Sequence, residues 1–174
     1  MSKLPAIKGN IVLLAACFLL ASCGLQPLYS GGTNGVVASS LGHVEVEPIA
    51  GKAGWLMRNA LNDQLSTIEG SEVKYRLVVE LDDKIAGFGV RSNDRITRER
   101  RTLRARYQLV RLSDDAVVLD ATAGSDAGID VVSSEYATVV AEETALENLS
   151  VRVADQIVKR LSLFAREQTA DSGN

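Results

Sequence analysis

The sequence predicts an α+β fold in which a four-stranded, mostly antiparallel sheet carries two helices on one face, in the order β-α-β-β-β-α. Two patterns lead to this class. Residues 73–81 and 96–112 alternate apolar and polar side chains, which is the period of a strand with one buried face. Residues 136–164 repeat apolar side chains every three or four positions, which is the period of an amphipathic helix. One-sided strands need an apolar cover, and two such helices supply it.

One short strand and one helix are predicted before the long strands. Residues 43–49 are predicted to form the strand, in which valine alternates with glutamate before Pro48. Pro48 has no N–H to donate to a ladder, so it marks the end of the strand or an edge position. Residues 51–69 are predicted to form a helix that ends before a glycine. We interpret Trp55 as a core residue beside its buried face. That face is predicted to comprise Leu56, Ala60, Leu65 and Ile68.

Three long elements follow. A polar connection over residues 87–94 is predicted to join the second strand to the third, which spans residues 96–112. A tight turn then leads to a fourth strand over residues 116–123, and a loop over residues 124–134 precedes the last helix. The apolar stripe of that helix is predicted to comprise Leu146, Leu149, Val153, Ile157, Leu161 and Phe164.

The first 22 residues have the layout of a secretory signal. Two lysines precede an uncharged apolar run over residues 11–21, which has about half of the roughly 20 residues that a membrane-spanning helix needs. The run ends in Leu20-Ala21-Ser22-Cys23, which resembles the bacterial lipobox, whose cysteine is acylated and becomes the new N-terminus. We therefore predict that residues 1–22 are a lipoprotein signal peptide and that Cys23 carries a covalent lipid. The alternative is an ordinary cleaved signal followed by an incidental cysteine.

The remaining chain is predicted to hold one domain. Residues 23–42 comprise the lipidated cysteine and a flexible tether rich in small residues, residues 43–168 a single α+β domain, and residues 169–174 a disordered tail. Removal of the signal would leave 17 basic and 22 acidic residues, a net charge of −5 (17 − 22), which gives no indication of a nucleic-acid partner. Because Cys17 would be removed and Cys23 lipidated, no disulfide is expected.

The segment after the predicted cleavage site carries a family resemblance. Cys23-Gly24-Leu25-Gln26-Pro27-Leu28-Tyr29 is similar to the start of the lipopolysaccharide-assembly lipoproteins, the LptE family, in its alphaproteobacterial form. Residues 57–61, 100–109 and 134–143 also resemble segments of this family. The resemblance implies the β-α-β-β-β-α layout. It further implies a non-enzymatic lipoprotein that assists lipopolysaccharide assembly together with the β-barrel LptD.

The same resemblance implies a location. Gly24 follows the cysteine, in place of the aspartate that retains lipoproteins in the inner membrane. We therefore expect a protein anchored by its lipid to the periplasmic side of the outer membrane.

An arginine cluster is the main candidate for ligand contact. Residues 91–111 hold eight arginines against Asp94 and Glu99, a local excess of +6 (8 − 2). Arginine binds phosphate bidentately, and like charges crowded on one strand face are unfavourable unless an anion relieves them. Alternation places Arg101 on the core side, so it is left out. We predict that lipopolysaccharide, an outer-membrane anion, contacts Arg91, Arg95, Arg98, Arg100, Arg104 and Arg106.

Other interpretations remain open. The arginines could form a solvated face, paired with Glu80, Asp82 and the acids of neighbouring strands. The protein could also be a periplasm-facing carrier with its own apolar cavity for a lipid or lipoprotein acyl chain, although an aromatic content of 5% argues mildly against it. With His43 as the single histidine and no free cysteine expected, we predict no catalytic residues, no metal and no cofactor besides the lipid on Cys23.

Overall fold

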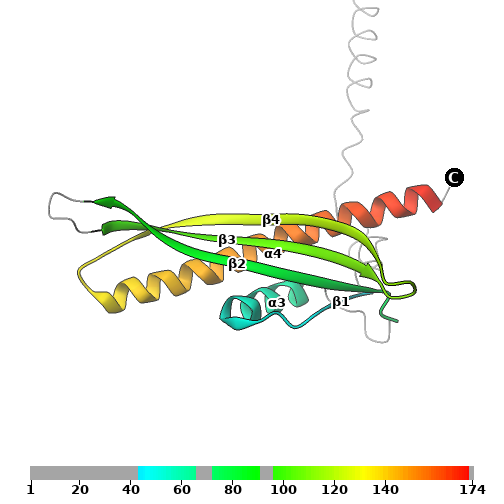
Figure 1. Ribbon diagram of the computed structural model, residues 1–174, viewed down its shortest axis with the longest axis horizontal. Helices are drawn as coiled ribbons and strands as arrows, with labels where there is room; N and C mark the ends of the chain where they lie inside the picture. The colour runs from blue at the N-terminus through cyan, green and yellow to red at the C-terminus, as the bar shows by residue number, and fades with distance from the viewer. Residues whose placement is uncertain (1–42, 66–71, 91–95, 173–174) are drawn as a thin grey trace, which may run out of the picture. The chain divides into compact units, whose positions relative to one another are not determined.

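The computed structural model describes residues 43–65, 72–90 and 96–172, which form a four-stranded sheet and two helices (Figure 1). The strands lie in the order β1-β2-β3-β4, with β1 parallel to β2 and the other neighbours antiparallel. The predicted α+β class and element order are confirmed. In chain order the elements are β1 (Val44–Val46), α3 (Gly51–Leu65), β2 (Tyr75–Val90), β3 (Ile96–Arg111), β4 (Ala116–Asp130) and α4 (Glu135–Ser172).

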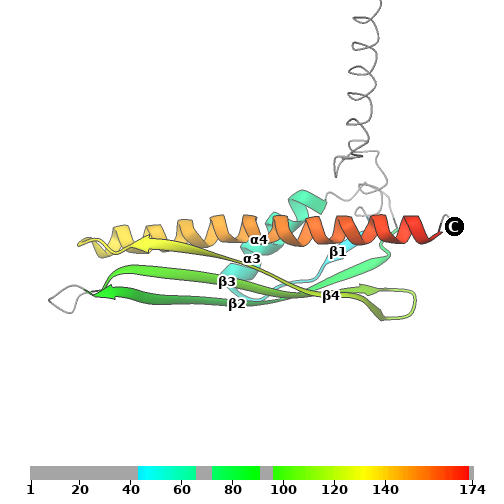
Figure 2. The same cartoon turned by 90° about the horizontal axis from the view of Figure 1, so that it is seen from above.

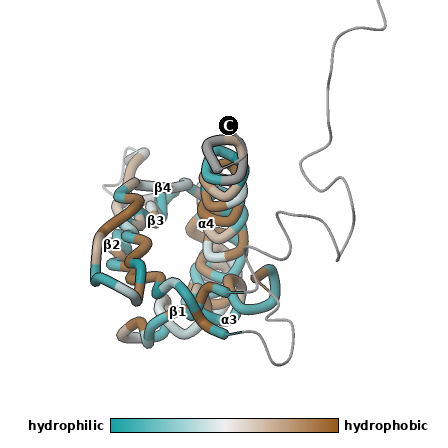
Figure 3. Tube along the Cα trace, turned by 90° about the vertical axis from the view of Figure 1, so that its right-hand side faces the viewer, coloured by the Kyte–Doolittle hydropathy of each residue, from teal (hydrophilic) through white to brown (hydrophobic). Residues whose placement is uncertain are grey.

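Both helices cover the same face of the sheet. Figure 2 shows α4 running along the sheet with α3 beside it, and the end-on view in Figure 3 separates a layer of helices from a layer of strands. The described elements all belong to one compact unit of the chain. The other face of the sheet is covered by none of the described elements, and side chains of β3 on that face, such as Arg104 and Arg106, are exposed.

The core lies between α4 and the central strand β3. On α4, Leu149, Val153 and Ile157 are fully buried, and the predicted stripe is confirmed as far as Phe164, which packs against the edge of the core. Burying each large apolar side chain contributes about 1.5–3 kcal/mol. This burial fixes which side of β3 faces the helices. The residues of β3 on that side are Leu103, Ala105, Tyr107 and Leu109, all at most 2% exposed.

β2 and β4 run further than the sequence predicts. Instead of a connection over residues 87–94, β2 continues to Val90, and residues 87 and 88 pair with β3. Instead of a loop over residues 124–134, β4 continues to Asp130. Glycines in both segments suggest loops, but ladder hydrogen bonds need only backbone groups, and the long strand β3 offers them to both neighbours. The first strand is shorter than predicted, with three residues.

The face that α3 turns to the core matches the predicted one only in part, since Leu65 is buried as predicted. Leu56 and Ala60 are only partly buried, and Ile68 lies outside the described residues. Trp55 is 63% exposed, so its interpretation as a core residue is wrong. A Cβ at Gly54 would collide with the backbone of Ile49, so this glycine, and not Trp55, is the residue that fits against the preceding segment. The buried residues of α3 are Gly54, Met57, Leu61 and Leu65.

α4 is longer than the predicted helix over residues 136–164. It reaches Ser172 and therefore includes residues 169–172, for which the sequence predicts a disordered tail. No glycine or proline interrupts residues 135–172, and Gly173 is the first helix breaker. Among the described residues, no helix has an apolar stretch long enough to cross a membrane.

Candidate functional site

The face of the sheet turned away from the helices carries the predicted arginines. Successive side chains of a strand point to opposite faces, so burial of the odd-numbered residues of β3 sends the even-numbered ones outward. Four predicted site residues share this outer face and are exposed, and we call it the arginine face. They are Arg98, Arg100, Arg104 and Arg106. The other predicted site residues, Arg91, Arg95 and Cys23, lie outside the described residues.

Arg101 lies on the helix side of β3, as alternation predicts. Its side chain is 12% exposed. Its Nε donates to Asp83 on β2 at 2.9 Å, and its Nη1 donates to the carbonyl oxygen of Glu142 on α4 at 2.8 Å. The hydrogen bond to Asp83 raises the pKa of Arg101 further above its ordinary value. Arg101 therefore links two strands and a helix, and it is not part of the arginine face.

Three of the four outward arginines are paired with aspartates of β4. Their partners follow from the register, because β4 also places its even-numbered residues on the outer face. Arg98 pairs with the residue directly opposite, whereas each of the other two reaches diagonally to an aspartate two residues away from the one opposite. The pairs are Arg98 with Asp130 at 2.9 Å, Arg104 with Asp126 at 3.3 Å and Arg106 with Asp120 at 2.9 Å.

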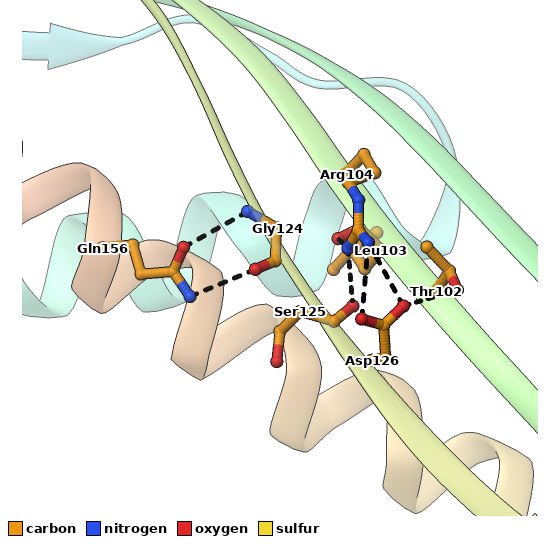
Figure 4. Close-up of polar contacts among 7 residues, drawn as sticks. All are labelled: Thr102, Leu103, Arg104, Gly124, Ser125, Asp126 and Gln156. Carbon is orange, nitrogen blue, oxygen red and sulfur yellow. Dashed lines mark hydrogen bonds and ion pairs between the residues drawn. The ribbon is translucent and has the colours of Figure 1, made fainter.

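The aspartates of β4 also accept bonds from neutral side chains of β3. Thr102 donates to Asp126 at 2.7 Å, beside the bonds from Arg104 (Figure 4). Gln108 donates to Asp120 at 2.8 Å. The alternative of arginines paired with neighbouring strands thus holds for three of them.

The acids of β2 take a smaller part in this pairing than the sequence suggests. Asp82 lies across from Arg104 in the register, yet it forms an ion pair with Lys84 on its own strand at 2.6 Å. Glu80 lies across from Arg106 and contributes only a distant favourable charge to its pKa. The main carboxylate partners therefore come from β4.

Arg100 stands apart from this pattern. Its neighbours across the strands are Ala86 on β2 and Gly128 on β4, neither of which offers a carboxylate. Its guanidinium carbon lies 5.2 Å from the centre of the Phe88 ring, a cation–π distance. A Cβ at Gly128 would meet nothing within 4 Å, so the space beside Arg100 is open. Among the described residues, Arg100 forms no ion pair.

The pKa values of the aspartates follow from their donors. The hydrogen bond from Arg106, and then that from Gln108, lowers the pKa of Asp120. For Asp126 the largest cause of a lowered pKa is the hydrogen bond from Thr102, followed by that from Arg104. Both aspartates are therefore ionised at neutral pH and neutralise much of the arginine charge.

One hollow on this face combines apolar groups with charged side chains of both signs. A groove of about 440 Å³ follows the surface of β2 and β3, with Glu80, Asp82, Arg104 and Arg106 along it and Leu81 and Ala105 at its floor. Charged side chains of both signs suit a hydrated surface better than a stored acyl chain. Within the described ranges, no group of three or more acidic, histidine or cysteine side chains could hold a metal ion.

Replacing Arg106 with Gln is expected to raise the pKa of Asp120 towards its ordinary value and to leave the pKa of Asp126 unchanged, because Asp126 has other donors. A lowered native pKa stabilises the fold above the unfolded pKa, and this stabilisation is lost as pH falls through the native value. The variant should therefore lose less stability in acid. NMR titration of the aspartate carboxyl carbons measures both values. Equal shifts of the two aspartates would contradict the separate pairing described above.

Comparisons with known proteins agree with this fold. A family model described as LptE, lipopolysaccharide-assembly, matches residues 41–161. The protein RP188 of Rickettsia prowazekii (strain Madrid E) is 25% identical over 154 residues, which cover 88% of this chain and 96% of that protein.

Two solved structures have the same fold. A protein of Caulobacter crescentus CB15 described as a lipoprotein aligns with a TM-score of 0.64 and 23% identity, over 77% of this chain and 98% of that one. Rare lipoprotein B of Shewanella oneidensis aligns with a TM-score of 0.54 and 10% identity, over 74% of this chain and 98% of that one. Because the family match covers most of the sequence, from just before β1 into α4, the chain belongs to the LptE family of lipopolysaccharide-assembly proteins.

Proposed function

We propose that this protein is an outer-membrane lipoprotein that works with the β-barrel LptD in lipopolysaccharide assembly and contacts lipopolysaccharide through the arginine face. Membership of the LptE family supports the role in assembly. The signal-like residues 1–22 and the lipobox that ends at Cys23 support a lipid anchor on the periplasmic side of the outer membrane. No catalytic step is assigned, because the work of such a protein runs through its partner and its ligand.

Arg100 is the observation that carries the ligand contact. Its guanidinium is exposed, rests on an aromatic ring and has no carboxylate directly across from it on either neighbouring strand. The charge of Arg100 contributes to the lowered pKa of Asp126, but the side chain forms no ion pair among the described residues. A phosphate that reached this position would meet a planar fork, the geometry that phosphate prefers. Arg104 and Arg106 would have to share their N–H groups with an aspartate, so their contribution is smaller. Arg91 and Arg95 lie outside the described residues and stay predicted contacts.

The paired charges of the arginine face support a partner with a polar interior. Because arginines of β3 and aspartates of β4 lie side by side on this face, it carries many charged side chains but has a net charge near zero. Such a surface suits contact with the hydrated lumen of a β-barrel. The carrier hypothesis lacks comparable support. The facing side chains of α4 and β3 are buried against one another and fill the space between the layers.

Replacing Arg100 with Gln is expected to weaken lipopolysaccharide binding by about tenfold, which corresponds to the loss of about 1.4 kcal/mol from one charge-assisted contact. Arg106→Gln, on the same strand face, is the matched control and should change binding by less than about threefold, because Asp120 competes for this side chain. Binding of lipopolysaccharide to the purified full chain measures both, and added salt should weaken the unmutated protein. Equal losses in the two variants would contradict the special role of Arg100, and no loss in either would assign the face to barrel docking or solubility.

Cys23→Ala is expected to abolish acyl labelling and to release the protein from sedimented membranes, because the acyl chains on one residue supply the anchor. Cys17→Ala is the matched control, since this cysteine lies inside the predicted signal, and it should leave both labelling and sedimentation unchanged. Metabolic labelling with a fatty acid, followed by membrane fractionation, measures the two properties. Persistent labelling of the Cys23 variant would overturn the assignment of the anchor.

The partner can be tested directly. Affinity-tagged protein from detergent-solubilised outer membranes is expected to bring down a large β-barrel in constant ratio, because a protein held in the lumen of a barrel forms an extensive interface with it. Mass spectrometry of the purified complex identifies the partner and its stoichiometry. Repeated recovery of a lipid-loaded monomer without a barrel would favour the carrier hypothesis instead.

A further inference from the structure

The free edge of β4 already holds one peptide-like group. The backbone N–H of Gly124 donates to Oε1 of Gln156 on α4 at 3.2 Å, and Nε2 of Gln156 donates to the carbonyl oxygen of Gly124 at 3.2 Å (Figure 4). A residue of an added antiparallel strand would make the same two bonds. The side-chain amide of Gln156 therefore occupies the place of a neighbouring strand at Gly124.

The direction of these bonds shows which other residues of β4 point outward. Backbone groups alternate along a strand, so residues 126, 128 and 130 direct their N–H and C=O groups to the same side as Gly124. The bond from the N–H of Val131 to the carbonyl oxygen of Thr97 on β3, at 3.0 Å, agrees, because it places the odd-numbered residues inward. The register shows no irregularity between residues 124 and 130. Because β4 is the last strand of the sheet, this part of the edge has no neighbouring strand among the described residues, and Gln156 takes that place only at Gly124.

A groove runs beside the same part of the edge. It has a volume of about 320 Å³ and lies between β4 and α4. Ala127 and Gly128 line it from β4. From α4 the apolar Ala141, Ala145 and Leu149 line it together with the polar Thr144, Asn148 and Arg152, so its walls combine small or apolar groups with polar ones. Arg152 lies on the same wall, nearer to Gln156 along α4. An unpaired edge next to a groove for alternate side chains is the arrangement that binds extended peptides.

The negative charge of two aspartates distinguishes between two possible occupants of this edge: a second copy of β4 and a strand of another protein. The outward side chains of this segment include Asp126 and Asp130, which remain 46% and 75% exposed although each is paired with an arginine. In an antiparallel pair of two β4 edges centred on Gly128, Asp126 of each copy would face Asp130 of the other. Like charges directly opposite are destabilising. A strand with basic side chains on that face meets complementary charge instead.

We propose that the edge of β4 over residues 126–130, together with the groove beside it, binds an extended segment of a partner protein as a fifth strand. That segment carries small apolar side chains towards the groove and basic side chains towards the aspartates. Gln156 ends the binding edge at Gly124. This site is separate from the contact proposed for Arg100 and does not depend on it.

The test uses the full chain in detergent and a fluorescent octapeptide that alternates lysine with valine. Two control peptides accompany it: one with glutamate in place of lysine, and one with the same lysines but N-methyl groups on alternate amides, which cannot pair with the edge. Fluorescence anisotropy is expected to show at least about tenfold weaker binding of both controls. Hydrogen exchange should slow at the amides of residues 126, 128 and 130 when the lysine peptide binds.

Variants locate the binding. Thr144→Trp fills the groove and should weaken peptide binding by about tenfold or more, whereas Val151→Trp, an exposed position of α4 that does not line the groove, should leave it unchanged. Asn148→Trp fills the groove from a second position if the first variant unfolds by circular dichroism. Gln156→Ala frees Gly124 and should tighten binding several-fold.

Three results would overturn the proposal. The first is equal binding of the lysine and N-methylated peptides, which would indicate attraction by overall charge alone. The second is unchanged binding in both groove variants. The third is dimerisation of the protein itself, seen by sedimentation and lost in the groove variants, which would make a second copy the occupant of this edge.

Discussion

The packing of α4 against β3 is the contact on which the other features depend. Leu149, Val153 and Ile157 are buried in one core with odd-numbered side chains of β3. Because successive side chains of a strand point to opposite faces, the even-numbered ones lie on the other face of the sheet. The arginine face is thus a consequence of core burial. Arg101, like Glu99 two residues earlier, is a charged residue on the helix side of β3, and it lies where the apolar core ends. It occupies an odd-numbered position, and there Asp83 and the backbone of α4 at Glu142 replace apolar neighbours.

Strand register then decides how the arginine charge is distributed. The aspartates of β4 fall on the same face as the arginines and neutralise three of them, while Ala86 and Gly128 fall opposite Arg100 and leave it without a carboxylate across either strand. A shift of one residue in the β3–β4 pairing would turn the aspartates towards the helices, where unpaired carboxylates are costly. The charged face and the apolar face therefore support the same register. Each exposed ion pair of this kind stabilises the fold only slightly. Their main consequence is that Arg100 differs from the other three arginines in having no carboxylate partner in the described part of the chain.

The sequence alone predicted the fold class, the element order, the apolar stripe of α4 and which side chains of β3 face the helices. Each of these depends on the local spacing of apolar residues. It was not sufficient for the arginine pairing, which depends on how strands align. That alignment includes an irregularity between Leu109 and Val110 that no local pattern indicates. One error also caused another. Ending the fourth strand at residue 123 assigned Asp126 and Asp130 to a loop and hid the regular placement of aspartates on even-numbered positions. The prediction that Trp55 is a core residue was wrong for a different reason: the close approach of Gly54 to Ile49 sets the rotation of α3 about its axis.

Along the edge of β4, the side chains of α4 determine where the outward backbone hydrogen-bonding groups are satisfied and where they are left open. At Gly124 the side chain of Gln156 is long enough to reach the backbone and closes the edge. Towards the start of α4, Ala141 and Ala145 are too short to do so, and a groove remains. A long open edge invites pairing with another copy, and inward or outward charges are a common protection against it. Here the protecting aspartates are the same residues that neutralise the arginine face. Their negative charge disfavours a second copy of the edge and favours a basic strand, so one row of side chains sets the character of two surfaces.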